Sequence, residues 1–416
     1  MIPAFLRVRP PGPLRARRLF PPSLLALLLP GFAFAAPQHR VAPIFPPESW
    51  HNHGSCIVET PDGDLLACWF HGSGERTADD VKILGARLRA GSETWSEPFL
   101  MADTPGLPDT NCCMIVDREH RLWLLWPTIQ DNRWESALMK YRISSGYSAD
   151  GPPHWEIERV LHVKPGDRFP ALVREKTAAY LSHRRLLPEA IEWAAANFRQ
   201  ADDKLTRRIG WFTRAHPLIS EEGRMLVGLY SDGFSFSLTA WTDDGGDSWS
   251  FSEPMVGGGN IQPSFARRDD GTLVAFMRDN GPPPKRVHVS ESRDLGETWS
   301  PVEDHPQLAN PGSGLELIRL RDGRFLAVYN DTEEGRHSLA VSLSQDGGRT
   351  FPVTRHLEKS EPGRGQFHYP SVIEARDGAL HVSYSTFLPS SAGQTLKTIT
   401  HAAFNLEWVE AGPSGP

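Results

Sequence analysis

Short segments of alternating apolar and polar residues recur along most of the chain, and they come in pairs that flank a tight turn. Alternation with a period of two predicts β-strands, and a short polar turn between two such segments predicts a hairpin. Four of the turns contain Asp-Gly, a dipeptide typical of tight hairpin loops. The pattern therefore predicts six hairpins, at residues 57–66, 115–123, 218–226, 265–274, 317–326 and 372–381.

A second repeat lies between the hairpins. The runs TDDGGDSW (residues 242–249), SRDLGETW (292–299) and SQDGGRTF (344–351) place their aromatic residues 50 and 52 positions apart. Degenerate copies occur as GSETW at 91–95 and SADGPPHW at 148–155. The hydroxyl and carboxylate side chains of this phrase suit hydrogen bonds to the backbone amides of a turn, and its glycine suits a positive φ there. We therefore interpret its aspartates as structural rather than catalytic.

A repeat of about fifty residues predicts a propeller or a related array. Six hairpins, five of them followed by the turn phrase, predict six four-stranded blades around a central channel, which is an all-β six-bladed β-propeller over residues 36–416. One segment interrupts the repeat between the second and third blades. There, residues 186–206 carry apolar side chains at helical spacing after Pro188, and they predict a helical insertion.

The first 35 residues have the order of a secretory signal peptide. Five arginines precede an apolar run at residues 24–29, and the small-residue pattern at 33–35 follows it. The run is too short to span a bilayer, which takes about 20 residues, and no later segment is comparable. We therefore predict an exported protein, periplasmic or extracellular, without a membrane span. The run RRLF at 17–20 resembles a twin-arginine signal, so that route and the general export route both stay open.

Charge and cysteine content narrow the possible partners. The chain has 44 basic and 51 acidic residues, with no basic run that would follow a phosphate backbone, so we expect no nucleic-acid partner. The four cysteines lack the spacing of a zinc site, and neither a phosphate-binding glycine loop nor His-Glu-x-x-His occurs, so we expect no cofactor and no metal. A Cys56–Cys68 disulfide and buried thiols both remain open.

In a propeller, the entry loops and first strands of all blades surround one channel mouth. Two residues expected there, Arg278 and Arg336, suit planar, bidentate capture of a carboxylate, which indicates an acidic sugar. Ion pairs with Asp279 and with Glu333 or Glu334 are the alternative. The other polar residues expected at the mouth are His51, His53, Glu75, Arg76, Asp79, Asp80, Asn111, Arg214, His216, Gln262, Asn280, Asn310, Ser313, Asn330, His368 and Tyr369.

Three of these segments resemble sialidases, within a likeness that extends from about residue 53 to residue 404. The run YPSVIEARDG at 369–378 has the spacing of the sialidase strand that carries a tyrosine nucleophile. The runs DGTLVAFMR at 270–278 and NDTEEGR at 330–336 resemble strands that carry two of the three arginines that bind the sugar carboxylate. The resemblance implies a propeller glycosidase with Tyr369 as nucleophile, a recognised departure from the two-carboxylate scheme, and with Arg278 and Arg336 as carboxylate ligands.

The chain departs from the sialidase pattern at two charged positions. The first arginine of the family falls at His53 within WHNHGS, and the glutamate that makes the tyrosine more basic falls at Gln262 within NIQPS. The acid/base aspartate falls in the loop at residues 72–80, where Glu75, Asp79 and Asp80 compete. A proton donor in this loop requires one carboxyl group whose pKa is raised by burial or by a like-charged neighbour.

We expect an exo-glycosidase that acts on a glycan bearing an acidic sugar, sialic acid among the candidates. One alternative is a polysaccharide lyase that neutralises a uronate carboxylate and removes the adjacent proton with histidine and tyrosine. Another is a non-catalytic carbohydrate-binding propeller. The predicted catalytic residues are Tyr369, Glu75, Asp79, Asp80 and His53, and the predicted substrate-binding residues are Arg278, Arg336, Gln262, Arg76, Arg214, His216 and His368.

Overall fold

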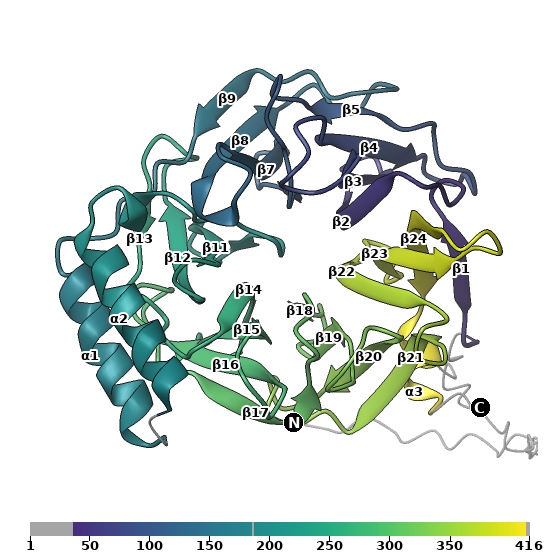
Figure 1. Cartoon of the computed structure of the whole chain (residues 1–416). Coiled ribbons are helices and arrows are strands. Elements are labelled where there is room, and N and C mark those ends of the chain that lie inside the picture. Colours follow the sequence, from purple (N-terminus) through teal and green to yellow (C-terminus); the bar gives the residue numbers. More distant parts are fainter. Residues whose placement is uncertain (1–35, 185–186, 413–416) are drawn as a thin grey trace, which may run out of the picture. The chain divides into compact units, whose positions relative to one another are not determined.

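Six antiparallel sheets of four strands each form a ring in the computed structural model, which describes residues 36–184 and 187–412 (Figure 1). In five of these sheets the four strands are consecutive in the chain, and in the sixth β22, β23 and β24 are followed at the outer edge by β1. The predicted six-bladed β-propeller is confirmed. Residues 1–35, where the signal peptide is predicted, lie outside the described residues. In the described part of the chain, no helix has the length and apolar character needed to cross a membrane.

The strand bounds follow the blades in chain order. Blade 1 contains β2 (His51–Glu59), β3 (Leu65–Gly72), β4 (Lys82–Leu88) and β5 (Phe99–Ala102), and blade 2 contains β6 (Cys113–Val116), β7 (Leu122–Ile129), β8 (Ala137–Ser144) and β9 (Ile157–Val160). Blade 3 contains β10 (Leu218–Ile219), β11 (Met225–Ser231), β12 (Phe236–Thr242) and β13 (Ser250–Phe251), and blade 4 contains β14 (Asn260–Arg267), β15 (Leu273–Asp279), β16 (Arg286–Ser292) and β17 (Glu303–Ala309). Blade 5 contains β18 (Glu316–Arg319), β19 (Phe325–Tyr329), β20 (Ser338–Ser344) and β21 (Val353–Lys359), and blade 6 contains β22 (Gln366–Glu374), β23 (Leu380–Pro389), β24 (Thr395–Phe404) and β1 (His39–Pro43).

The N-terminal strand β1 is the outer strand of the last blade. It pairs antiparallel with β24 from His39 opposite Phe404 to Pro43 opposite Thr400. The first and the last strand that the structure describes therefore share one sheet, and this pairing closes the ring. A short helix, α3 (Leu406–Glu410), follows β24.

The predicted hairpins are the first two strands of each blade. In blade 1, for example, Val58 pairs with Leu66, and in blade 3 Leu218 pairs with Leu226 across the predicted turns. Alternate residues of these strands enter the core, where large aromatic side chains are completely buried. The largest are Trp69, Trp123, Trp126 and Trp211.

The repeated turn phrase joins the third strand of a blade to the fourth. In blade 4, the Asp294 carboxylate accepts hydrogen bonds from the Thr298 amide at 2.9 Å and from the Glu297 amide at 3.2 Å. The Trp299 ring then stacks on Phe265 with ring centroids 5.3 Å apart. The carboxylates at 244 and 346 accept the equivalent amide hydrogen bonds at 2.9 Å. The aspartates of the phrase therefore hold turns, as the sequence predicts.

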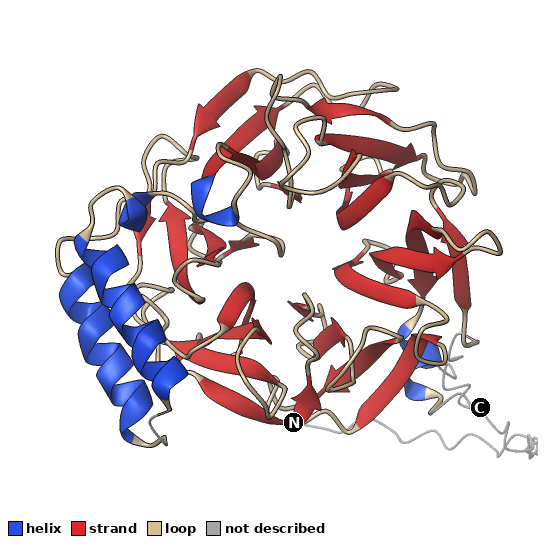
Figure 2. Cartoon of the chain, viewed as in Figure 1, coloured by secondary structure: helices blue, strands red, loops and turns tan. Residues whose placement is uncertain are grey.

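The helical insertion is longer than predicted. It consists of α1 (Phe169–Ser182) and α2 (Pro188–Asp202), with a 3₁₀ turn at Thr206–Arg208, whereas the sequence analysis places the helical segment at 186–206. The pair lies beside the ring (blue in Figure 2). The first helix was missed although Phe169, Leu172 and Val173 are buried at helical spacing, which is a usable signal.

All four cysteines are free thiols and all are buried. We predict four reactive thiols per chain when the purified protein is titrated with a thiol reagent in denaturant without reductant. The folded protein should react slowly because none of the sulfur atoms is exposed. A count of two in denaturant would instead show that one disulfide has formed, and peptide mapping would then test the pair Cys56 and Cys68, which face each other across β2 and β3.

We predict that Asp294→Ala lowers the free energy of unfolding by about 1–2 kcal/mol, because several backbone and hydroxyl hydrogen bonds lose their acceptor. Denaturant titration followed by tryptophan fluorescence measures this change. Unchanged stability would contradict the structural role of the phrase.

Candidate active site

A cavity of about 270 Å³ collects polar side chains from all six blades. Strands β2, β14 and β22 begin at this cavity, while β11 and β15 end there. Because first and second strands of a blade run in opposite directions, these ends lie at the same edge of the ring. The lining residues are His53, Glu75, Asn111, Trp134, Tyr230, Asp232, Gln262, Arg278, Asn280, Arg336 and Tyr369.

Three of the inner strands contain a backbone bulge near the cavity. Register shifts occur in β2 after His53, in β14 after Ile261 and in β22 after His368. Within the last two, Gln262 (φ 57°) and Tyr369 (φ 56°) have a left-handed conformation that is unfavourable for residues other than glycine. Each such residue costs about 1–3 kcal/mol. A bulge re-aims a side chain, and here both re-aimed side chains line the cavity.

Tyr369 lies against two guanidinium groups. Arg278 Nη1 donates a hydrogen bond to the Tyr369 hydroxyl at 2.8 Å, and the Arg336 guanidinium lies over the tyrosine ring, 5.4 Å from its centroid. Burial alone would raise the pKa of the Tyr369 hydroxyl, but the positive charges of Arg278 and Arg336 outweigh burial and lower that pKa. The hydroxyl of Tyr369 therefore loses its proton at a lower pH than that of an ordinary buried tyrosine.

Neither arginine is neutralised by an acidic side chain among the described residues. Asp279 lies 3.6 Å from Lys285 and from His288, and Glu333 pairs with Arg286 at 2.5 Å. The ion pairs considered as an alternative for Arg278 and Arg336 are therefore not formed. Both guanidinium groups line the cavity with hydrogen-bonding capacity left for an anion.

His53 takes the place of the expected first arginine, and it is neutral. Its Nδ1 lies 2.9 Å from the Ser385 hydroxyl, and its ring is 4.4 Å from the Tyr369 ring and 4.7 Å from the His368 ring. Burial, followed by neighbouring histidines and arginines, lowers the pKa of both imidazoles well below 6.5. His53 therefore adds hydrogen-bonding capacity to the cavity but no positive charge, whereas His368 is buried and is not among the lining residues.

The acidic loop brings one of its three candidate carboxyl groups to the cavity. Glu75 lines it and lies 3.2 Å from His51 Nε2. Burial would raise the pKa of Glu75, but the contact with His51 lowers it below its usual value. Asp80 accepts hydrogen bonds from the Ser73 amide and hydroxyl, while Asp79 accepts one from a side-chain amide at 2.8 Å, so both hold the loop instead. Arg76 is not among the lining residues; it lies over the Trp134 ring at 5.2 Å.

Three lining residues were not predicted from the sequence: Trp134, Tyr230 and Asp232. Tyr230 accepts hydrogen bonds from Gln262 Nε2 at 3.0 Å and from Asn111 Nδ2 at 3.1 Å, and burial raises its pKa well above 10. Tyr230 lies near the end of β11, as Arg278 lies near the end of β15. The two residues occupy equivalent positions in neighbouring blades, so comparing the blades in the sequence could have identified Tyr230 as a lining residue.

Arg214 was predicted at the mouth but is not a lining residue. Its guanidinium donates hydrogen bonds to the carbonyl oxygens of Tyr369 at 2.5 Å and of Pro370 at 3.2 Å. These two acceptors belong to the bulge of β22. Arg214 thus supports the left-handed backbone that presents the tyrosine.

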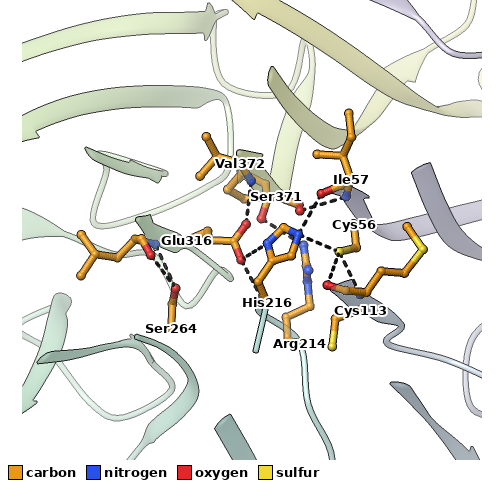
Figure 3. Close-up of polar contacts among 12 residues, drawn as sticks. Cys56, Ile57, Cys113, Arg214, His216, Ser264, Glu316, Ser371 and Val372 are labelled. Carbon is orange, nitrogen blue, oxygen red and sulfur yellow. Dashed lines mark hydrogen bonds and ion pairs between the residues drawn. The ribbon is translucent and has the colours of Figure 1, made fainter. Parts of the chain in front are cut away.

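His216 likewise is not among the residues that line the cavity. Figure 3 shows its contacts with Glu316 and Cys56. The Nδ1 of His216 is 2.7 Å from Glu316 Oε1, and its Nε2 is 3.2 Å from Cys56 Sγ. The other oxygen of Glu316 accepts a hydrogen bond from the Val372 amide at 2.6 Å. This buried polar layer connects blades 1, 3, 5 and 6 through the channel and includes the strand that carries Tyr369.

The fold and the ring of polar residues define a sialidase-like six-bladed propeller. Residues 63–214 and 208–382 match the family model described as BNR repeat-like domain, and the chain belongs to this family. The chain is 26% identical over 143 residues to a sialidase of Bacteroides fragilis (strain YCH46), a match that covers 32% of this chain and 26% of the relative. It is 25% identical over 182 residues to an anhydrosialidase of Macrobdella decora, covering 40% of this chain and 23% of that protein.

A solved structure shares the propeller fold. The leech intramolecular trans-sialidase in complex with 2,7-anhydro-Neu5Ac superposes with a TM-score of 0.64 and 13% identity, over 88% of this chain and 70% of that chain. At this identity the likeness establishes the fold. The matches to the two curated relatives span about a quarter of the length of each.

We predict that Glu316→Gln lowers the free energy of unfolding by about 3 kcal/mol at neutral pH, because it removes one partner of a buried ion pair. Burial would raise the pKa of Glu316, but His216 lowers it, so the contribution of Glu316 is present above about pH 4.3 and is lost on acidification. Burial would lower the pKa of His216, but Cys56 and Glu316 raise it, so its contribution is present below about pH 6.5 and is lost on alkalinisation.

The stability difference between the wild-type protein and Glu316→Gln should therefore be largest between about pH 4.3 and 6.5. Urea titrations at several pH values measure it. The exposed residue Glu97, which lies outside the helices and strands, provides the matched control, since Glu97→Gln should not change stability. A difference that does not vary with pH would contradict an ionised pair.

Proposed function

We propose that this protein is a glycoside hydrolase that removes a terminal acidic sugar from a glycan, with sialic acid as the first candidate. The observation that carries the proposal is the pair of guanidinium groups at Tyr369, one donating to its hydroxyl and the other lying over its ring, neither of which has an ion-pair partner among the described residues. The cavity of about 270 Å³ lies just below the roughly 300–1,000 Å³ of sites for drug-sized ligands, which favours one sugar residue over a chain.

In the proposed reaction, Arg278 and Arg336 hold the sugar carboxylate by bidentate hydrogen bonds. The Tyr369 hydroxyl first loses its proton to solvent, and the phenolate oxygen then attacks the anomeric carbon while the bond from that carbon to the leaving-group oxygen breaks. The leaving oxygen takes a proton from a carboxyl group of the cavity, for which Glu75 is the candidate of the acidic loop. Water then hydrolyses the sugar–tyrosine bond, and the same carboxylate accepts the proton from that water.

Two arginines substitute in part for the missing glutamate. Gln262 carries no charge and cannot take the proton of the tyrosine, but the adjacent guanidinium groups already lower the pKa of that hydroxyl. A nucleophile of lowered pKa is a general means of activation. This supports a tyrosine nucleophile despite the replacement.

One observation favours a second candidate, a lyase that acts on uronate-containing polysaccharides. His53 is a neutral imidazole whose ring lies 4.4 Å from the Tyr369 ring, beside arginines that would neutralise a carboxylate. A neutral imidazole or a phenolate can accept the proton adjacent to such a carboxylate. The product would then carry a carbon–carbon double bond, which hydrolysis does not create.

We predict that the purified protein releases 4-methylumbelliferone from its sialic acid glycoside and that Tyr369→Phe lowers kcat by roughly 10³-fold or more, as expected for loss of a nucleophile. Tyr329→Phe is the matched control, because Tyr329 is buried in blade 5 and hydrogen-bonded to Ser342, away from the cavity. This control should retain wild-type kcat.

The outcomes separate the candidates. Release that survives Tyr369→Phe would contradict the assigned nucleophile. If folded protein releases nothing, uronate polysaccharides are tested for a product that absorbs in the ultraviolet, which would identify the lyase. Binding of acidic glycans by calorimetry without any product would identify a carbohydrate-binding propeller.

A further inference from the structure

Asp232 is a cavity carboxyl group that neither the turn phrase nor the sialidase-like motifs explain. It lies in the turn between β11 and β12 and is partly exposed to the cavity that Arg278 and Tyr369 also line. No hydrogen bond or ion pair joins its carboxylate to any other residue in the described ranges. Buried or half-buried carboxyl groups with a structural role are normally hydrogen-bonded, so this one is free to contact a ligand.

The turn that carries Asp232 is held by helix α2. Asn197 Nδ2 donates to the Phe234 carbonyl at 3.1 Å, Trp193 Nε1 donates to the same oxygen at 3.3 Å, and Gln200 Nε2 donates to the Gly233 carbonyl at 3.1 Å. The three donors are spaced by four and three residues, so they share one face of the helix. Asn197 is completely buried. This face of α2 therefore points at the turn next to Asp232.

Packing fixes the same turn from several sides. A Cβ atom at Gly233 would lie 2.8 Å from Gln200 Oε1 and 3.1 Å from Glu135 Cγ, so a larger residue there would displace the Gln200 side chain that binds this turn. The Phe234 ring stacks on Trp211 at 5.3 Å and meets Phe169 of α1 edge-on at 5.7 Å. These contacts hold the turn in one position. Such support is expected for a turn that carries a binding residue and not for a free loop.

We propose that Asp232 is a specificity-determining residue that hydrogen-bonds a hydroxyl group of the sugar, and that α2 is the positioning element that fixes it. The inference rests on the proposed function in one respect, since the sugar is the acidic one whose carboxylate Arg278 and Arg336 hold. A site with a polar group aimed at a substrate hydroxyl discriminates strongly against ligands that lack it.

The electrostatics of the cavity agree with this role. Burial raises the pKa of Asp232, and Glu135 of the preceding blade and Glu75 of the acidic loop act in the same direction, while Arg278 and Arg76 oppose it. The protonated form therefore persists to higher pH than in an exposed aspartate and can both donate to and accept from a hydroxyl group. Asparagine has nearly the same shape and also offers both a donor and an acceptor.

The test measures affinity for free N-acetylneuraminic acid and free glucuronic acid by calorimetry, together with kcat and KM on the aryl sialoside. Asp232→Ala should weaken the affinity for the sugar that the wild-type protein binds by about 10- to 100-fold and change kcat less than threefold. Asp232→Asn should stay within about tenfold of wild-type affinity. Asp103→Ala is the matched control, because Asp103 is exposed and away from the cavity.

The outcomes of this test are distinct. Unchanged affinity in Asp232→Ala overturns the proposal, and so does a large loss of kcat at constant affinity, which would make Asp232 a proton donor. If the wild-type protein binds an acidic sugar but does not turn over the aryl sialoside, the proposed hydrolase activity is contradicted. The affinities of the Asp232 variants still test the role of Asp232 in that case. Wild-type protein that binds neither sugar overturns both.

A second set of variants tests the helix. The double substitution Asn197→Ala with Gln200→Ala should lower sugar affinity about 3- to 10-fold, whereas Glu192→Ala on the exposed face should not. In the Asp232→Ala background, the double substitution should have no further effect, because a positioning element acts only through the residue it positions. Independent, additive losses would overturn the positioning role.

Discussion

The pairing of β1 with β24 closes the ring, and the cavity depends on this closure. Its lining residues come from all six blades, so no single blade contains a site. Closure places β2 beside β22, where the Gly54 and Ile57 amides donate to the hydroxyls of Ser385 and Ser371. His53 and Tyr369 are neighbours only because the first and last blades meet there.

Within the closed ring, the site is built on strained backbone that deeper contacts stabilise. Tyr369 has a left-handed conformation, Arg214 binds its carbonyl oxygen, and Glu316 binds the Val372 amide three residues later. The polar layer in the channel is thus a support for the tyrosine rather than part of the binding surface. This explains how a costly local conformation persists: the surrounding hydrogen bonds over-determine it.

The sequence predicts the blades well because their signals are local. Alternation and turn chemistry within about ten residues determine each hairpin, and the turn phrase carries its own hydrogen bonds. The distance of a side chain from the cavity, however, does not follow from the neighbouring residues alone. Strand β10 has only two residues, so the loop before it determines where Arg214 and His216 lie. Asp232 was missed for a related reason, because its position depends on contacts with α2, far away in the preceding insertion.

Two carboxyl groups in one cavity have pKa values shifted in opposite directions. His51 lowers the pKa of Glu75, and burial raises that of Asp232. Arg76 and Arg336 also contribute to the lowering at Glu75. A bound sugar carboxylate would neutralise part of this positive charge, so it would raise the pKa of Glu75 and favour its protonated form. A proton donor at Glu75 is therefore compatible with its low pKa in the empty cavity, because substrate binding itself supplies the negative charge that reverses the shift.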